Sequence, residues 1–170
     1  MALLRIFLFT ILVFSCQLAA GQTTFAKLYT ATGYDYGRDV IESFQDSGLV
    51  VTGSSSSFTT GTADALLLKT DSLGNFEWSY VFGGSGSDWG HKVIQTQDTG
   101  YVIAGYTNSM GAGGFDFYVI KTDQYGQRLW DTTFGGSNWD IAHSLIELPN
   151  KDLVIVGETQ SFGNGNKDGY

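Results

Sequence analysis

Trp89 and Trp139 are the residues of this sequence whose chemistry points most directly to a ligand. Exposed indole rings stack on sugar rings, and many secreted proteins bind glycans in this way. Both tryptophans follow Gly-Gly turns, and they lie 50 residues apart, whereas the repeat described below has a spacing of 52. We therefore expect them to project differently from Trp78 and Trp130, which gives a glycan-binding hypothesis. Packing in the core between repeat units is the alternative.

Asp88 is a candidate calcium ligand. It closes the loop 83–88, Gly-Gly-Ser-Gly-Ser-Asp, which is similar to one turn of a calcium-binding nonapeptide repeat. Such repeats assemble their oxygen ligands from copies stacked at the nonapeptide spacing, whereas this loop recurs once in about 52 residues. A turn between two repeat units is therefore the favoured interpretation, with calcium binding as the alternative.

His91 and His143, the only histidines, occupy equivalent positions in neighbouring copies, where the first copy has Arg38. We expect such equivalents to lie apart unless they line a central channel, and no cysteine follows residue 21 to complete a zinc site. The sequence has no Gly-x-Ser-x-Gly elbow, and no serine is paired with a histidine and an aspartate. We predict no catalytic residue, no metal site and no cofactor; enzymatic activity stays open, with a non-enzymatic role favoured.

An internal repeat of about 52 residues must position these side chains. The same residue type recurs at this spacing in all three copies at Gly53, Gly105 and Gly157, and at Asp64, Asp116 and Asp168. The copies cover approximately residues 33–84, 85–136 and 137–170, and the third is incomplete. Residues 22–170 are thus predicted to be one run of tandem units.

Each copy has the pattern of four short β-strands. In the second copy we predict strands at 91–95, 101–106, 116–122 and 128–134, separated by turn sequences such as 98–100, Asp-Thr-Gly. The 23 glycines, the 15% aromatic residues and the single proline favour β structure over helix. Tandem units of this length with four antiparallel strands are typical of β-propeller blades. We predict an all-β fold, a partial β-propeller of nearly three four-stranded antiparallel blades.

The pattern Thr-Asp-x-x-Gly-x-x-x-Trp at 70–78 and 122–130 resembles the sialidase Asp-box and the hairpin of quinoprotein propellers. In those proteins the aspartate caps a tight turn, the glycine takes positive φ and the tryptophan packs between blades. The resemblance implies a structural role for this motif.

Residues 1–21 are predicted to be a signal peptide. A positive amino-terminal region precedes a short apolar run at 6–14, and the small residues 19–21 place signal-peptidase cleavage before Gln22. The alternative is a lipoprotein anchored through Cys16, which directly follows the apolar run. Either interpretation places the protein outside the cytoplasm, secreted or on the cell surface, with no transmembrane span in the mature chain.

Residues 25–29 are predicted to be a lone fourth strand. Aligning Asp35 with Asp88 places Phe25 opposite Trp78 and Tyr29 opposite Phe82. Such a strand could close a propeller by completing the blade formed by the carboxyl terminus. Because fewer than three blades do not close a ring easily, we interpret the chain as part of a longer protein, with assembly of several copies as the alternative.

The segments 82–88, 100–107 and 118–123 (FGGSGSD, GYVIAGYT and YVIKTD) resemble secreted β-propeller repeat proteins of bacteria and archaea, of a kind common in Bacteroidetes. The resemblance covers residues 25–170. It implies an exported protein with further modules, and it brings no catalytic residues with it.

The net charge of -8 argues against nucleic acid or an anionic membrane as a partner. We predict a non-enzymatic binding or scaffold module with an extracellular ligand, either a glycan or a protein. The alternatives are part of a carbohydrate-active enzyme whose catalytic residues lie outside this chain, and a repeat spacer in an adhesin.

Overall fold

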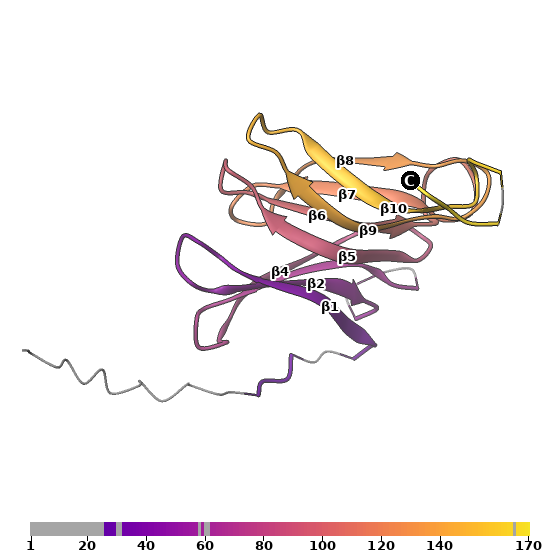
Figure 1. Cartoon of the computed structure of the whole chain (residues 1–170). Helices are drawn as coiled ribbons and strands as arrows, with labels where there is room; N and C mark the ends of the chain where they lie inside the picture. Colours follow the sequence, from indigo (N-terminus) through magenta and orange to yellow (C-terminus); the bar gives the residue numbers. More distant parts are fainter. Residues whose placement is uncertain (1–25, 30–31, 58, 60–61, 165) are drawn as a thin grey trace, which may run out of the picture.

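The computed structural model describes residues 26–29, 32–57, 59, 62–164 and 166–170, which form eleven β-strands and no helix. The strands make three antiparallel sheets, and neighbours along the chain are neighbours in each sheet (Figure 1). The first sheet contains β1 (Asp35–Glu42), β2 (Leu49–Ser55), β3 (Asp64–Thr70) and β4 (Phe76–Phe82). The second contains β5 (Asp88–Gln95), β6 (Tyr101–Thr107), β7 (Asp116–Thr122) and β8 (Arg128–Phe134). The third contains β9 (Asp140–Glu147), β10 (Leu153–Thr159) and the short β11 (Asp168–Gly169).

The predicted all-β fold with repeated antiparallel units is confirmed. The first two copies have four strands each, the third has three within the described residues, and the sheets do not form a closed barrel there. The bounds of β7 and β8 match the prediction, whereas β5 begins at Asp88 rather than at His91. The difference arises because 88–90 already pair with β6, ahead of an interruption at His91.

Local hydrogen bonds fix the turn between the first two strands of each sheet in the same way. A side-chain oxygen of Asp46, Asp98 or Asn150 accepts the N–H two residues further on, at 3.0, 3.1 and 3.2 Å. The intervening residue has positive φ in all three turns, between 56° and 71°. Asn150 therefore forms the same Asx turn as the aspartates of the other copies.

The Thr-Asp motif forms the turn before the last strand of the first two sheets. Asp71 Oδ1 accepts the N–H groups of Leu73 and Asn75 at 2.9 and 2.7 Å, and Gly74 has a φ of 72°. Asp123 and Gly126 repeat this geometry in the second sheet. The turn geometry that the resemblance implies is present in both copies. Trp78 packs at the junction with the second sheet, beside Tyr101, whereas Trp130 is 43% exposed, so the expected packing of the tryptophan is found only in the first copy.

The core lies between the faces of consecutive sheets. Val50, Ala65 and Leu67 of the first sheet pack against Val93 and Ile103 of the second, and all five are fully buried. A second cluster joins the opposite face of the second sheet to the third sheet through residues that include Val102, Ala104 and Leu145. Each middle strand thus buries alternate side chains in opposite directions, which explains the continuous apolar runs in β3 and β7.

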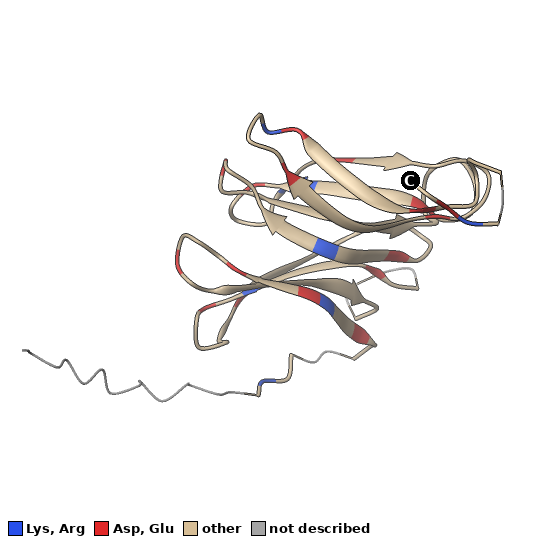
Figure 2. Cartoon of the chain, in the orientation of Figure 1, with Lys and Arg blue, Asp and Glu red and all other residues tan. Residues whose placement is uncertain are grey.

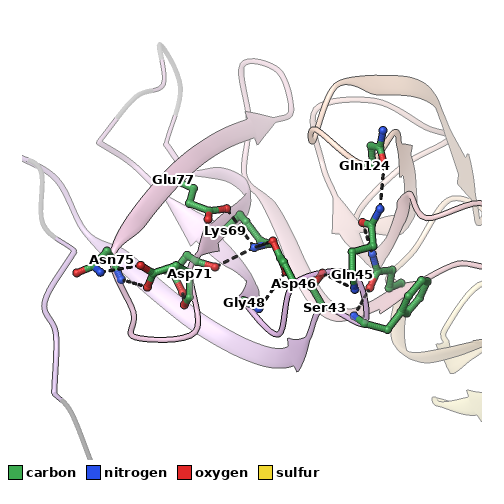
Figure 3. Close-up of polar contacts among 12 residues, drawn as sticks. Ser43, Gln45, Asp46, Gly48, Lys69, Asp71, Asn75, Glu77 and Gln124 are labelled. Carbon is green, nitrogen blue, oxygen red and sulfur yellow. Dashed lines mark hydrogen bonds and ion pairs between the residues drawn. The ribbon is translucent and has the colours of Figure 1, made fainter.

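A buried lysine holds the turn end of each of the first two sheets. Lys69 Nζ contacts Asp46 at 2.8 Å and Glu77 at 3.1 Å, and it donates to the carbonyl of Thr70 (Figure 3). Burial disfavours the charge, but the two carboxylates outweigh it and raise the pKa of Lys69. Lys121 makes the equivalent contact with Asp98 at 2.8 Å. Burial opposes ionisation of Asp98 too, yet its hydrogen bonds with Lys121 and Thr96 lower its pKa to about 2.

The predicted signal peptide, Cys16 and Phe25 lie outside the described residues. Residues 26–29 form no strand, and they lie against the β3–β4 turn of the first sheet. There Lys27 Nζ donates to Asn75 Oδ1 and the Tyr29 hydroxyl donates to the carbonyl of Gly74, each at 2.5 Å. The closing strand at 25–29 stays a prediction. The described residues contain no helix with the length and hydrophobicity that crossing a membrane requires.

Candidate functional site

The first strands of the three sheets lie side by side and carry a β-bulge at the same place. β1 contacts β5, and β5 contacts β9. The pairing with the second strand skips one residue in each sheet, and that residue is Arg38, His91 or His143. A bulge inserts an unpaired residue and redirects its side chain. Arg38, His91 and His143, which are equivalent in the repeat, therefore each lie at the bulge of a first strand.

A glycine on the second strand makes room for each bulge. A Cβ on Gly105 would lie 1.7 Å from the carbonyl oxygen of Trp89, and one on Gly53 would lie 1.7 Å from that of Tyr36. Gly157 has the same close approach, to Ile141. The glycines spaced by 52 residues are thus explained by a backbone approach that excludes any side chain.

His91 and His143 lie together, the arrangement that was expected only for equivalents that line a central channel. Their rings are stacked with centroids 5.7 Å apart. His91 Nδ1 donates to the carbonyl of Ala142 at 3.0 Å, which leaves Nε2 of the neutral ring as an acceptor. Burial, together with the charges of Arg38 and His143, lowers the pKa of His91. The rings lie together because β5 and β9 are neighbours and their bulges occur at equivalent positions along the two strands.

Five aromatic side chains form a continuous line beside the bulges, which we call the aromatic track: Tyr36, Trp89, Tyr106, Phe115 and Trp139. Consecutive ring centroids are 5.4, 6.2, 4.9 and 5.2 Å apart. The guanidinium carbon of Arg38 lies 5.2 Å from the centroid of the Trp89 ring. Such a contact combines a cation with an aromatic face. The track crosses all three sheets at the end where their first strands begin.

The two sequence-predicted tryptophans belong to this track, although they are not in equivalent positions. Trp89 is the second residue of β5, whereas Trp139 directly precedes β9. Tyr106 and Phe115 connect them. Trp89 is partly buried between Tyr36 and Tyr106, while Trp139 is 51% exposed. The aromatic track therefore contains both a packed ring, that of Trp89, and an exposed ring, that of Trp139.

Sequence reasoning missed Tyr36, Tyr106 and Phe115 as members of the track. One signal was present: an aromatic residue followed by glycine occurs at 36–37 and again at 89–90, directly before the bulge. Tyr106 and Phe115 are at the two ends of the β6–β7 connection, and only the fold brings them to β5 and β9.

Asp88 is fully buried and paired with another carboxylate. Its Oδ2 accepts the N–H of Gly84 at 3.0 Å and the hydroxyl of Ser109 at 2.6 Å. A Cβ on Gly83 would lie 2.2 Å from that oxygen and 2.6 Å from Asp64 Oδ1. Oδ1 of each aspartate is buried without a hydrogen-bond partner. Burial, with the charge of Asp88 as a second cause, raises the pKa of Asp64 to about 6.

Burial keeps this carboxylate pair away from solvent. Two carboxyl groups can hydrolyse a glycosidic bond, but both must reach the sugar. Asp64 is 9% exposed and Asp88 is not exposed at all. The next junction repeats the pair, because Asp116 and Asp140 approach Gly135 in the same way. Loop 83–88 thus forms the predicted turn between units.

Calcium binding at Asp88 stays a prediction. Within the described residues no three His, Cys, Asp or Glu side chains are grouped so that they could hold a metal ion. Acidic and basic positions are interspersed along the strands and turns of the cartoon in Figure 2.

Comparison of the sequence with protein-family models and with curated proteins finds no match. The protein is therefore characterised by its fold and by the geometry of the candidate site. It is an all-β protein of tandem antiparallel sheets, with an aromatic track that begins on the bulged first strands β1 and β5 and continues through β6 to the residue before β9.

Proposed function

We propose that the three sheets are blades of a β-propeller and that the chain is an exported, non-enzymatic module that binds carbohydrate along the aromatic track. The blade arrangement is supported by the face-to-face packing of consecutive sheets and by the adjacency of β1, β5 and β9, since first strands converge around the axis of a propeller. The sequence resemblance to secreted propeller repeats supports export.

The aromatic track is the observation that carries the carbohydrate proposal. Tyr36 and Trp139, at its two ends, are each 51% exposed, so both offer ring surface to a ligand. Aromatic faces stack on the apolar faces of sugar rings, and nearby polar groups fix their orientation. The bulge residues supply such groups, because Arg38 carries a donor fork and His91 a free ring nitrogen. A line of rings across three sheets suits an extended oligosaccharide.

Binding can be tested with a glycan array followed by calorimetry on the oligosaccharides retained. We expect Trp139→Ala and Tyr36→Ala each to weaken binding at least tenfold, since each removes a stacking surface. Trp130→Ala is the matched control, because Trp130 is 43% exposed but lies on β8 outside the track. Equal loss in all three variants, or retention of no glycan, would contradict the proposal.

Export is a separate part of the proposal. The intact mass of the protein recovered outside the cytoplasm should correspond to a chain that begins at Gln22. A mass that corresponds to a lipid-modified chain beginning at Cys16 would replace the secreted form by the anchored one. Recovery of the uncleaved chain in the cytoplasm would contradict export.

A further inference from the structure

The two outermost sheet faces are apolar and have no partner among the described residues. On the first sheet, Val51, Leu66 and Leu68 point away from the second sheet, and they line a cavity of about 570 Å³. Val40, on β1 of this sheet, is 56% exposed. On the third sheet, Ile146, Val154 and Val156 are 55%, 41% and 51% exposed. Contiguous apolar surface of this kind marks an interaction site.

The repeat shows what each face is built to contact. Val40 and Val51 pair in the first sheet as Val93 and Ile103 pair in the second, and the latter two are completely buried against the first sheet. The outer face of the first sheet is thus equivalent to the side of the second sheet that receives a preceding sheet.

The outer face of the third sheet is equivalent to the other side of such a junction between sheets. Val154 and Val156 are equivalent by the repeat to Val102 and Ala104, which are completely buried against the third sheet. The outer face of the third sheet is thus the side that receives a following sheet. The two unpartnered faces are therefore the two halves of the junction that already occurs twice within the chain.

The segment 26–29 supports the same arrangement. Lys27 contacts Asn75 beside the first sheet, and at the next junction Tyr80 of β4 contacts Gln127 beside the second. Lys27 and Tyr80 are equivalent in the alignment that places Asp35 opposite Asp88, and Asn75 and Gln127 are equivalent in the repeat. Tyr29 and Leu28 line the cavity over Leu66 and Leu68. The segment lies where the fourth strand of a preceding sheet would lie, and the third sheet has no fourth strand in the described residues.

We propose that two copies of this chain associate head to tail, so that the third sheet of each packs on the first sheet of the other. Segment 26–29 of one copy then lies beside β11 of the other, as its fourth strand. Such a heterologous contact forms either a closed ring or an open filament. The described residues of two copies contain six sheets, within the roughly four to eight blades of propellers, so we infer a closed dimer of residues 22–170. The stoichiometry rests on the proposed propeller. Tyr36 of the aromatic track also lines the cavity on the first sheet, so Trp139 is the track residue that separates carbohydrate binding from association.

The oligomeric state of the mature chain tests this proposal by light scattering after size-exclusion chromatography. We expect twice the chain mass for the wild type, and a monomer for Val40→Glu and for Val156→Glu, each of which places a charge on one face. Both positions are exposed in the single chain, so neither substitution disturbs its own fold. Leu129→Glu is the matched control, because Leu129 is 59% exposed on β8 and its equivalent in the first sheet is Glu77. This variant should stay dimeric.

Mixing the two monomeric variants distinguishes head-to-tail contact from a symmetric one. The third sheet of the Val40→Glu chain and the first sheet of the Val156→Glu chain are intact, so an equimolar mixture should regain a dimer with one junction. A mixture that stays monomeric, or a wild type that is monomeric, would overturn the proposal. Long filaments of the wild type would overturn the closed dimer. Loss of glycan binding in Trp139→Ala would change none of these results, because Trp139 does not line the cavity on the first sheet.

Discussion

The imidazole rings of His91 and His143 are stacked with centroids 5.7 Å apart and planes inclined by 5°. They belong to two sheets, and each is the unpaired residue of a bulge. The stack therefore lies at the junction between the second and third sheets, where a change in either ring affects the contact between β5 and β9.

The contribution of His91 to the stability of the protein should fall as the pH decreases below about 6.5. Its pKa is lowered in the folded state, so below 6.5 the unfolded chain binds the proton first and is favoured. Above 6.5 both states are neutral at this ring, and the contribution is complete. His91→Asn should reduce the difference between melting temperatures at pH 7.5 and 5.5. An NMR titration in which the ring of His91 titrates above 6.5 would contradict this assignment.

Asp64→Asn should stabilise the protein at neutral pH. The pKa of Asp64 is about 6 in the folded state and has its ordinary value of 3.8 in the unfolded chain, so the stability falls as the pH rises from 3.8 through 6 and stays low above it. The amide removes the charge facing Asp88, and we expect the melting temperature at pH 7.5 to rise by a few degrees. Asp140→Asn is the control. Asp140 accepts hydrogen bonds from Gly136 and Ser161, so the amide should destabilise there. A lower melting temperature for both variants would refute the like-charge interpretation.

Lys121→Met should destabilise by about 2 kcal/mol, because it leaves Asp98 and the carbonyl of Thr122 without their partner. The pKa of Asp98 should then rise from about 2 toward its ordinary value. Lys92→Met removes a more exposed ion pair, with Asp39 at 3.0 Å, and should cost less than about 1 kcal/mol. Urea denaturation of the two variants measures the difference; equal losses would show that burial of Lys121 contributes nothing.

Gly105→Ala should disrupt the second sheet. The added methyl group would lie 1.7 Å from the carbonyl oxygen of Trp89, so β5 must move away and the bulge at His91 must change. We expect a loss of about 3 kcal/mol or more in the free energy of unfolding. Gly169→Ala is the control, since no atom lies within 4 Å of its added Cβ. Nearly equal denaturation midpoints would mean that the bulge is not held by this close approach.

The strands and turns were predictable because each depends on short-range patterns. Alternation, Asx turns and the repeat spacing located β7 and β8 correctly, and the turn at Asn150 follows the other copies although its sequence differs. The bulges were not predicted, because one extra residue in β5 breaks the alternation, and the aromatic-glycine pairs at 36–37 and 89–90 indicate a bulge only once the strand pairing is known. For this reason the strand was expected to begin at His91.

The candidate site was only partly predictable. Trp89 and Trp139 could be selected because exposed indoles have a recognisable chemistry. Their connection through Tyr106 depends on pairing between β5 and β6, and the stacking of the two histidines depends on the packing of β9 against β5. Both are long-range relationships that spacing along one sequence does not specify.

The buried ion pairs of Lys69 and Lys121 have a consequence for the origin of the molecule. Each lysine finds its carboxylate, Asp46 or Asp98, within the same repeat unit. The gain or loss of one whole unit therefore separates neither lysine from its carboxylate. With respect to these ion pairs, one repeat is thus a self-contained unit of duplication, and chains with different numbers of repeats keep the same lysine contacts.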